Sequence, residues 1–315
     1  MTDTPFRAVV VQAGSVPFDS PATLRKLLGL IEACAARGAK VAVFPEALLG
    51  TYPKGITFGA VVGDRRPEGR EWYRRYYASS VEVPGAETAA IGKACAAAGL
   101  TSVIGVIERD GGTLYCTAVF FGPDGKLLGK HRKLMPTAAE RLVWGFGDGS
   151  TMPVVDTPHG RLASVICWEN YMPMLRMAMY SRHVQLYCAP TADDRETWLP
   201  TMRTIALEGR CFVLSACQFV TRGAYPADYP CELSNDPAYV MIRGGSCIID
   251  PAGRVLAGPT FDEETILDAE IDLAEVARGK YDLDVVGHYS RPDIFRLEVN
   301  ESPRTAAKWR TEPPG

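Results

Sequence analysis

The chain has 315 residues, 47% of them hydrophobic, and a formal net charge of −3 at pH 7. This length can bury one large core or two smaller ones, and because no Pro/Ser/Gly-rich linker or charge run divides the chain, we expect a single domain. The pI of about 5.9 and the lack of a second basic cluster argue against nucleic-acid binding. No run of about 18 apolar residues and no signal-peptide pattern is present, so we expect a cytoplasmic protein with no membrane span.

The cysteine and histidine patterns bear on redox compartment and metal binding. Nine cysteines are scattered with no C-x-x-C pair, and the four histidines lack metal-ligand spacing. An odd number of unclustered cysteines favours a reducing compartment and argues against a disulfide framework or a zinc site. We therefore expect neither a metal nor a cofactor, and no G-x-S-x-G motif supports a serine triad.

Strand-like and helix-like segments alternate along the chain. Apolar, β-branched runs predict strands at 7–11 and 41–45, and helical apolar spacing between them predicts a helix from Ser20 to about Arg37, with Pro21 in its first turn. The other expected elements are helices at 87–98, 172–181 and 198–208, a hairpin of strands 102–108 and 114–121, and strands at 161–167, 184–189, 211–218, 245–249 and 265–271. This alternation predicts an α/β protein with two sheets covered by helices.

Two segments depart from this periodicity. Residues 53–79 are rich in aromatic side chains and arginine, and residues 222–243 are rich in turn signals. Long connections in a compact domain are often functional. Each segment is therefore interpreted either as a surface excursion or as a lid or subunit contact.

Cys167 is the most informative candidate for chemistry. It closes the apolar run 162–167 and a turn follows at once, which predicts a thiol at the rim of a sheet beside backbone N–H groups that can stabilise an anion. A buried, inert cysteine is the alternative. That alternative is adopted for the cysteines in apolar surroundings: Cys34, Cys116, Cys188, Cys211, Cys217 and Cys247.

Two further segments supply acids and a cation. Glu46 follows the strand that stops at Pro45, where it is either a solvated loop residue or a carboxylate aimed at a site. The basic block 130–133 is typical of a solvated face, but one of its cations can instead point inward. The Gly-rich aromatic loop after this block carries another acid, Glu140. A cysteine, a lysine and two glutamates at strand ends are the components of a nucleophilic site.

Three blocks of the sequence resemble the nitrilase superfamily of carbon–nitrogen hydrolases. They are Phe44-Pro45-Glu46, Lys130-His131-Arg132-Lys133-Leu134 and Cys167-Trp168-Glu169-Asn170. The blocks occur in the family's order and at suitable spacing, and the resemblance runs from about Arg7 to about Phe295.

The resemblance also implies a fold and a branch. Segments 141–150, 167–173, 186–193 and 205–215 resemble the nitrilase branch, in its plant-type and related bacterial form. The implied fold is a single-domain four-layer α-β-β-α sandwich, with a catalytic domain over 6–273 and a C-terminal extension over 274–315.

The chemistry that the resemblance implies is hydrolysis of a nitrile. Cys167 would attack the nitrile carbon, Glu46 would act as general base, Lys133 would stabilise the tetrahedral species, and Glu140 would orient Lys133. Two waters would yield a carboxylic acid and ammonia through a thioimidate and a thioester. The side chains expected to contact substrate are Trp168, Tyr52, Trp144 and Tyr171. The alternatives are an aliphatic amidase of the same superfamily and a non-hydrolytic interaction protein on the same scaffold.

The expected partners are a small nitrile, water and further copies of the chain, with no nucleic acid and no membrane. The resemblance implies a homodimer, and related enzymes build larger spiral oligomers. The apolar segment from Tyr281 to Val299 is expected to contact a partner subunit, because exposed apolar patches usually mark contacts. Packing on its own subunit is the alternative.

Overall fold

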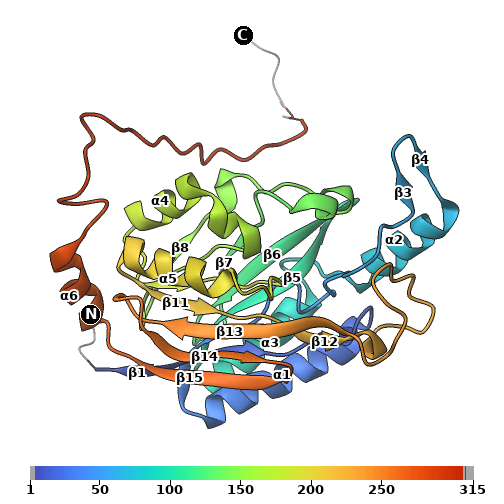
Figure 1. Cartoon of the computed structure of the whole chain (residues 1–315), viewed down its shortest axis with the longest axis horizontal. Helices are drawn as coiled ribbons and strands as arrows, with labels where there is room; N and C mark the ends of the chain where they lie inside the picture. The colour runs from blue at the N-terminus through green and yellow to red at the C-terminus, as the bar shows by residue number, and fades with distance from the viewer. Residues whose placement is uncertain (1–3, 308, 310–315) are drawn as a thin grey trace.

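Two β-sheets lie face to face at the centre of the molecule, and helices cover the outer face of each (Figure 1). The computed structural model describes residues 4–307 and 309. The resulting order of layers, helices, sheet, sheet and helices, confirms the predicted α-β-β-α sandwich.

The elements have the following bounds. The first sheet runs β15 (Thr265–Ile271), β1 (Phe6–Gln12), β2 (Ala39–Val43), β5 (Thr101–Asp110), β6 (Thr113–Phe121) and β7 (Leu127–Arg132). The second runs β12 (Phe219–Thr221), β13 (Val240–Ile249), β11 (Phe212–Ser215), β10 (Leu186–Cys188), β9 (Gly160–Ser164) and β8 (Val154–Thr157), with β14 (Val255–Phe261) paired to β13. The outer helices are α1 (Ser20–Ala36) and α3 (Ala86–Ala98) on the first sheet, and α4 (Pro173–Ser181) and α5 (Trp198–Gly209) on the second. The remaining elements are a small hairpin of β3 (Ala60–Val61) and β4 (Asp64–Arg65), α2 (Pro67–Ser79) and α6 (Ala274–Asp282).

Each sheet is apolar on both faces, because it is covered on both. In β1, Ala8 and Val10 face the space between the sheets, whereas Val9 and Val11 face α1 and α3. Side chains alternate along a strand, so a strand buried on both faces must be apolar throughout. A third core lies between the second sheet and helices α4 and α5.

The strand directions bring several chain ends to one edge of the sandwich. β2 is parallel to β1 and β5, and β7 runs in the same direction because β6 is antiparallel to both β5 and β7. In the second sheet β9, β10 and β11 are parallel. The carboxyl ends of parallel strands share an edge, which is where such sheets place their ligands.

The predicted elements are present, but several end earlier than expected. The strand predicted over 161–167 ends at Ser164, because Cys167 adopts a φ of 51°, which a strand does not allow, and starts a 3₁₀ turn over Cys167–Tyr171. The strands predicted to reach Pro45 and Gln218 end at Val43 and Ser215. The sequence did not predict β3, β4, β7, β8, β12, β14, α2 or α6, most of which are short or carry many charged residues.

The two aperiodic segments, 53–79 and 222–243, pack against each other. Tyr225 and Tyr229 donate their hydroxyl protons to the backbone carbonyls of Tyr52 and Lys54, at 2.8 and 2.9 Å. Trp72 of α2 is buried with its ring 5.3 Å from that of Tyr229. The two segments therefore form one structural unit beside the end of the sandwich, although more than 140 residues separate them in the sequence.

The C-terminal segment leaves the sandwich after α6. Val276 of α6 belongs to the core between the sheets, and Val285 and Val286 pack against the core beneath α4 and α5. Beyond them the chain runs past α4 on the outside of the molecule (Figure 1), and the backbone N–H of Arg304 donates to Asp148. The part of the predicted extension at 308 and 310–315 lies outside the described residues. No helix in the described part of the chain is long and apolar enough to cross a membrane.

Candidate active site

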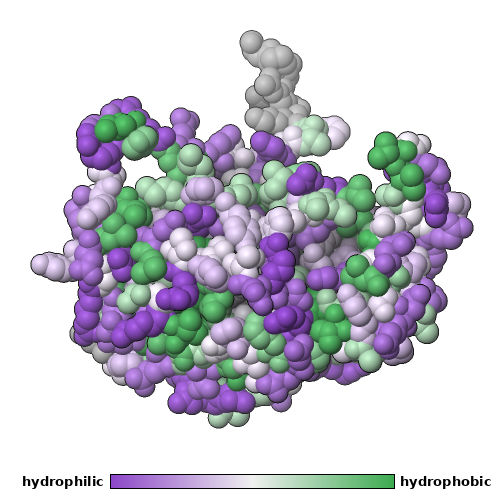
Figure 2. Space-filling model, in the orientation of Figure 1, coloured by the Kyte–Doolittle hydropathy of each residue, from purple (hydrophilic) through white to green (hydrophobic). Residues whose placement is uncertain are grey.

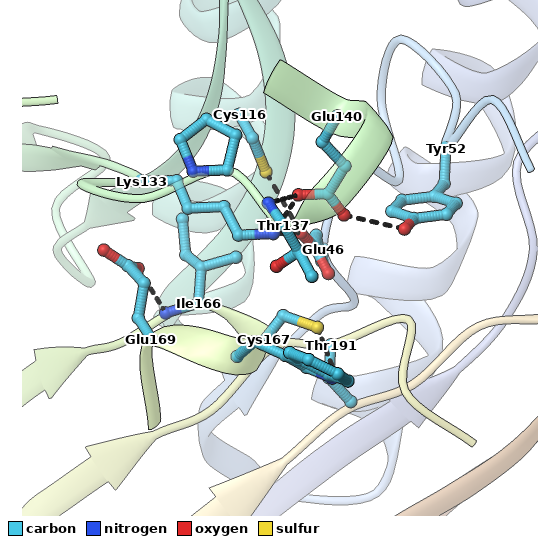
Figure 3. Close-up of polar contacts among 12 residues, drawn as sticks. Glu46, Tyr52, Cys116, Lys133, Thr137, Glu140, Ile166, Cys167, Glu169 and Thr191 are labelled. Carbon is cyan, nitrogen blue, oxygen red and sulfur yellow. Dashed lines mark hydrogen bonds and ion pairs between the residues drawn. The ribbon is translucent and has the colours of Figure 1, made fainter. Parts of the chain in front are cut away.

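Three strand ends place Glu46, Lys133 and Cys167 together, as Figure 3 shows. Glu46 follows β2, Lys133 directly follows β7, and Cys167 follows β9. The ammonium of Lys133 donates to Glu46 Oε1 and to Glu140 Oε2, both at 2.7 Å. Lys133 and Glu46 are 0% exposed. Burying one ammonium without partners would cost several kcal/mol, so the paired carboxylates are what permits a lysine at this position.

Glu140 is held in one orientation by three donors. It lies in the 3₁₀ turn Ala138–Leu142, and its Oε2 also accepts from the backbone N–H of Thr137 at 2.6 Å. Its other oxygen, Oε1, accepts from the hydroxyl of Tyr52 at 2.7 Å. Both oxygens are thus engaged, and the carboxylate presents a fixed charge to Lys133.

The two oxygens of Glu46 have different surroundings. Oε1 accepts from Lys133 and from the thiol of Cys116, whose sulfur is 3.4 Å away. Oε2 is buried and has no hydrogen-bond partner among the described residues. An unpaired buried carboxylate oxygen is costly and therefore marks a position where a substrate, water or thiol proton is expected.

The backbone around Glu46 is fixed by close packing. Gln218 donates its side-chain N–H to the carbonyl of Glu46 at 2.7 Å. Gly105 of β5 lies so near that a Cβ there would be 2.2 Å from the carbonyl oxygen of Pro45 and 2.7 Å from the Cα of Glu46. Only glycine fits at 105. The backbone of Glu46 can therefore pack directly against β5, and this contact fixes the position of the carboxylate in the site.

Cys167 sits at a sharp turn between β9 and the 3₁₀ turn. Its φ of 51° is unusual for a residue with a Cβ, and such strained positions concentrate at functional sites. The backbone N–H of Cys167 donates to Pro190 at 2.8 Å, and Asn170 donates its side-chain N–H to the carbonyl of Cys167 at 2.8 Å. Thr191 donates its hydroxyl to the sulfur at 3.2 Å. The turn directs the thiol toward the carboxylate of Glu46 (Figure 3).

Burial and the two carboxylates set the protonation states. Burial, and then the charge of Glu46, raise the pKa of the Cys167 thiol well above its ordinary value. Burial also raises the pKa of Glu46, although Lys133 opposes this. Burial alone would lower the pKa of Lys133, but Glu46, Cys167 and Glu140 raise it well above its ordinary value. At neutral pH the site therefore holds a lysine ammonium and a neutral thiol.

A cavity of about 330 Å³ opens beside Glu140. Its lining is mainly apolar and comes from the loop after β2, the 3₁₀ turn after β7 and one residue of the segment 222–243: Tyr52, Pro53, Lys54, Gly55, Ile56, Thr57, Phe58, Thr137, Ala138, Ala139, Glu140, Val143, Trp144 and Leu233. Small-molecule sites are typically apolar clefts with a few convergent polar groups. A larger cavity, of about 730 Å³, lies beside α6 and contains none of the predicted site residues.

The four predicted substrate contacts divide into two pairs. Tyr52 and Trp144 line the cavity, and their rings meet edge to face at 5.8 Å. Trp168 and Tyr171 are not among the lining residues and are 41% and 38% exposed. The indole N–H of Trp168 donates to Asp193 at 2.8 Å, and the ring of Tyr171 meets that of Trp168 at 5.7 Å.

The sequence interpretation missed two neighbours of the site. Cys116 was assigned to the core, and it is buried, but its thiol also contacts Glu46. One inward-pointing cation was expected in the block 130–133; both His131 and Lys133 are buried, because alternate residues of a strand share a face. β6 pairs with β7, and this pairing places Cys116 opposite Lys133. A prediction of β7 would therefore have identified Cys116 and His131 as neighbours of the site, but the sequence did not predict this strand.

Solved structures define the fold of the chain. The C. elegans NitFhit protein matches it with a TM-score of 0.73 and 20% sequence identity, covering 97% of this chain and 70% of that one. At this identity the likeness shows the fold alone, the same layered sandwich of sheets and helices. Within the described residues, no group of His, Cys, Asp or Glu side chains is arranged to hold a metal ion.

Sequence comparisons show the family. The model of the carbon–nitrogen hydrolase family matches residues 7–281, and the chain belongs to this family. A nitrilase from Bradyrhizobium diazoefficiens is 60% identical over 301 residues, which cover 96% of this chain and 94% of that protein. An aliphatic nitrilase from Sinorhizobium fredii is 58% identical over 307 residues, which cover 98% of this chain and 99% of that protein. The resemblance carried by the three sequence blocks is thereby confirmed.

Proposed function

We propose that the protein is a nitrilase, which converts a nitrile and two waters to a carboxylic acid and ammonia. The observation that carries this proposal is the buried ammonium of Lys133, held by Glu46 and Glu140 at the place toward which the thiol of Cys167 points. The nitrile-hydrolysing activity in the names of the two bacterial relatives supports the choice of a nitrile as substrate.

The first chemical step joins the thiol to the nitrile carbon. Because the pKa of Cys167 is raised, a thiolate does not accumulate, and the proton moves to Oε2 of Glu46 as sulfur attacks. The carbon–sulfur bond forms while one carbon–nitrogen π bond breaks. The electron pair goes to nitrogen, which takes a proton from Lys133, and the product is a neutral thioimidate.

Two additions of water complete the reaction. Glu46 first passes the proton that it took from Cys167 to Lys133, which restores the carboxylate and the ammonium. The first water then loses a proton to Glu46 and adds to the thioimidate carbon, while the nitrogen takes a proton from Lys133, and Glu46 again returns its proton to Lys133. The new hydroxyl loses its proton to Glu46 as the carbon–nitrogen bond breaks, nitrogen takes a second proton from Lys133 and leaves as ammonia, and a thioester remains. The second water adds in the same way, the carbon–sulfur bond breaks, and sulfur recovers its proton. Lys133 stabilises the negative charge that develops in each tetrahedral species, and Glu140 positions Lys133.

The cavity indicates the class of nitrile. Its walls present the side chains of Ile56, Phe58, Val143 and Leu233 beside the two aromatic rings of Tyr52 and Trp144. Such a lining favours an aliphatic or aryl-aliphatic group over a charged one, since burying an unpaired charge is expensive. In this account the side chain of the substrate occupies the cavity while its nitrile carbon reaches Cys167.

Replacing Cys167 tests the nucleophile. Cys167→Ala should lower ammonia release from nitriles at least about a thousandfold while the fold is kept, and Cys167→Ser should fail nearly as badly because a serine hydroxyl is far harder to ionise. A panel of aliphatic and aryl-aliphatic nitriles with ammonia detection measures this. Cys231→Ala, at a cysteine outside the site, is the control and should keep activity. More than a thousandth of wild-type release from Cys167→Ala would place the nucleophile elsewhere.

Two conservative substitutions in one basic block test the role of Lys133. Lys133→Arg should be almost inactive, because a planar guanidinium cannot occupy the position of a compact ammonium between two carboxylates. Lys130→Arg should stay close to wild type, because Lys130 is partly exposed and pairs with Glu108, which an arginine can also do. Steady-state kinetics of the two purified variants give the comparison. The reverse ranking would move the role to Lys130.

The pH dependence of kcat/KM tests Glu46 as the base. Glu46 accepts protons only when ionised, so activity is present above its pKa and is lost as the pH falls through it. Since burial raises this pKa above the ordinary 4.5, the acid limb of kcat/KM should lie above pH 4.5. Circular dichroism over the same range separates titration from acid unfolding. An acid limb at or below pH 4.5 in the folded protein would contradict the assignment.

We further propose that the protein acts as a homodimer or a larger homo-oligomer. Figure 2 shows apolar residues on the projecting β3–β4 hairpin and on the C-terminal segment, and the large side chains of Val62, Tyr281, Tyr289 and Phe295 are exposed. Exposed apolar groups that recur along a segment are typical of subunit contacts. The extension over 274–315 would then take part in subunit contacts.

Truncation before Tyr281 tests this assembly. Loss of the C-terminal segment should lower both the oligomer size, measured by light scattering, and the activity, because the exposed apolar side chains lose their partner surface. Circular dichroism of the truncated chain checks that the sandwich persists. An unchanged oligomer after truncation, or a monomeric wild type, would contradict the proposal.

A reducing, cytoplasmic setting fits the cysteines. Eight of the nine are buried as free thiols, and Cys231 is partly exposed. Free thiols persist where the surroundings are reducing. We therefore place the proposed activity in the cytoplasm.

A further inference from the structure

Glu169 is a buried carboxylate whose contacts reach both halves of the site. It lies in the 3₁₀ turn that begins at Cys167 and is 1% exposed. Its Oε1 accepts from the backbone N–H of Leu134 at 2.6 Å. Its Oε2 accepts from the backbone N–H of Ile166 at 2.9 Å, the contact drawn in Figure 3, and lies 3.0 Å from Nε2 of His131. The carboxylate therefore has three donors, from two different segments of the chain.

The contacts of His131 define its protonation. Its Nδ1 lies 2.7 Å from the carbonyl oxygen of Thr151, and its Nε2 faces the carboxylate of Glu169. Both neighbours are acceptors, so the geometry favours a proton on each ring nitrogen, which is the imidazolium form. Burial alone would lower the pKa of His131, but the charge and hydrogen bond of Glu169 raise it above its ordinary value. His131 and Glu169 thus form a buried ion pair.

The residues that donate hydrogen bonds to Glu169 flank Lys133 and Cys167 in the sequence. Lys133 lies between His131 and Leu134, which both donate to this carboxylate. Cys167 lies between Ile166, which also donates to it, and Glu169 itself. β7 belongs to the first sheet and β9 to the second, so one side chain ties the end of a strand in one sheet to the turn that follows a strand in the other.

We propose that Glu169 and His131 are positioning residues that fix the spacing between the ammonium of Lys133 and the thiol of Cys167. This inference rests on the proposed function, because it assigns a catalytic purpose to that spacing. Neither residue lines the cavity beside Glu140, so both act through their neighbours. His131 and Glu169 belong to two of the sequence blocks that resemble the family, yet neither takes part in the chemical steps. Their positioning role gives both residues a purpose.

The test compares Glu169→Gln with a matched substitution elsewhere. The control is Asp250→Asn in the β13–β14 turn. Asp250 is 2% exposed, and it accepts from the backbone N–H groups of Ala252 and Arg254 and from the guanidinium of Arg254. Both substitutions remove the charge of a buried carboxylate and keep its shape. Only Glu169→Gln alters the neighbours of Lys133 and Cys167.

Four quantities are measured on each purified protein: kcat and KM for a nitrile, the midpoint of thermal unfolding, and the rate at which iodoacetamide alkylates Cys167, followed by peptide mass spectrometry. For Glu169→Gln, kcat should fall about a hundredfold with KM within about threefold, as expected for a displacement near 1 Å. Alkylation of Cys167 should slow as well. Asp250→Asn should lower the unfolding midpoint but leave kcat and the alkylation rate within about twofold of wild type.

A second variant keeps the proposal testable if Glu169→Gln does not fold. His131→Gln leaves both backbone contacts of Glu169 and removes the imidazole with its contact to the carbonyl of Thr151, so it should lower kcat by a smaller factor. Where the double variant folds, adding His131→Gln to Glu169→Gln should lower kcat by a smaller factor than His131→Gln does in the wild type, since the two residues act as a unit. A kcat unchanged in Glu169→Gln, or lowered equally in Asp250→Asn, would overturn the proposal.

The alkylation rate separates failure of this inference from failure of the proposed function. Wild-type protein that hydrolyses no nitrile would contradict the proposed function. In that case the alkylation rates still report the positioning: slower alkylation in Glu169→Gln but not in Asp250→Asn supports it, and equal rates in all three proteins contradict it.

Discussion

The placement of one buried ammonium between two carboxylates is the constraint on which the rest of the site depends. Lys133 is 0% exposed and its 2.7 Å contacts go to Glu46 and Glu140. Removing both carboxylates would leave the ammonium without a partner in a low-dielectric interior, and breaking a buried ion pair in this way costs roughly 3–5 kcal/mol. With both present Lys133 stays an ammonium, while burial and then the charge of Glu46 raise the pKa of the Cys167 thiol and keep it protonated until a substrate arrives.

The fold supplies this arrangement through strand direction and close packing. Glu46 and Cys167 follow parallel strands that end at one edge of the sandwich, and Lys133 follows the second strand of the β6–β7 hairpin, which ends at the same edge. The absence of a side chain at Gly105 lets the backbone of Glu46 lie against β5. The carboxylate of Glu169 then joins the end of β7 to the Cys167 turn. Distances within the site are therefore set by backbone and buried groups.

The pattern of the sequence predicted two sheets covered by helices and singled out Glu46 and Cys167 for a physical reason, whereas the four-layer order and the roles of Lys133 and Glu140 came from the resemblance to the family. Strands buried on both faces are apolar throughout, so the polar residues that follow them, such as Glu46 and Cys167, stand out. β7 was missed because its charged side chains suggest a solvated surface, whereas Lys130 and Arg132 reach a buried carboxylate, Glu108, from another strand. Which aromatic side chains face the cavity also depends on contacts distant in sequence.

The account is tested most directly by trapping the covalent intermediate. Wild-type enzyme mixed with a nitrile that is hydrolysed slowly and quenched in acid should gain, by mass spectrometry, the mass of one thioimidate or acyl group. After digestion this mass should lie on the peptide that contains Cys167. An adduct on the peptide of Cys116 or Cys231, or turnover of the same nitrile with the enzyme mass unchanged at every quench time, would contradict a thiol nucleophile at Cys167.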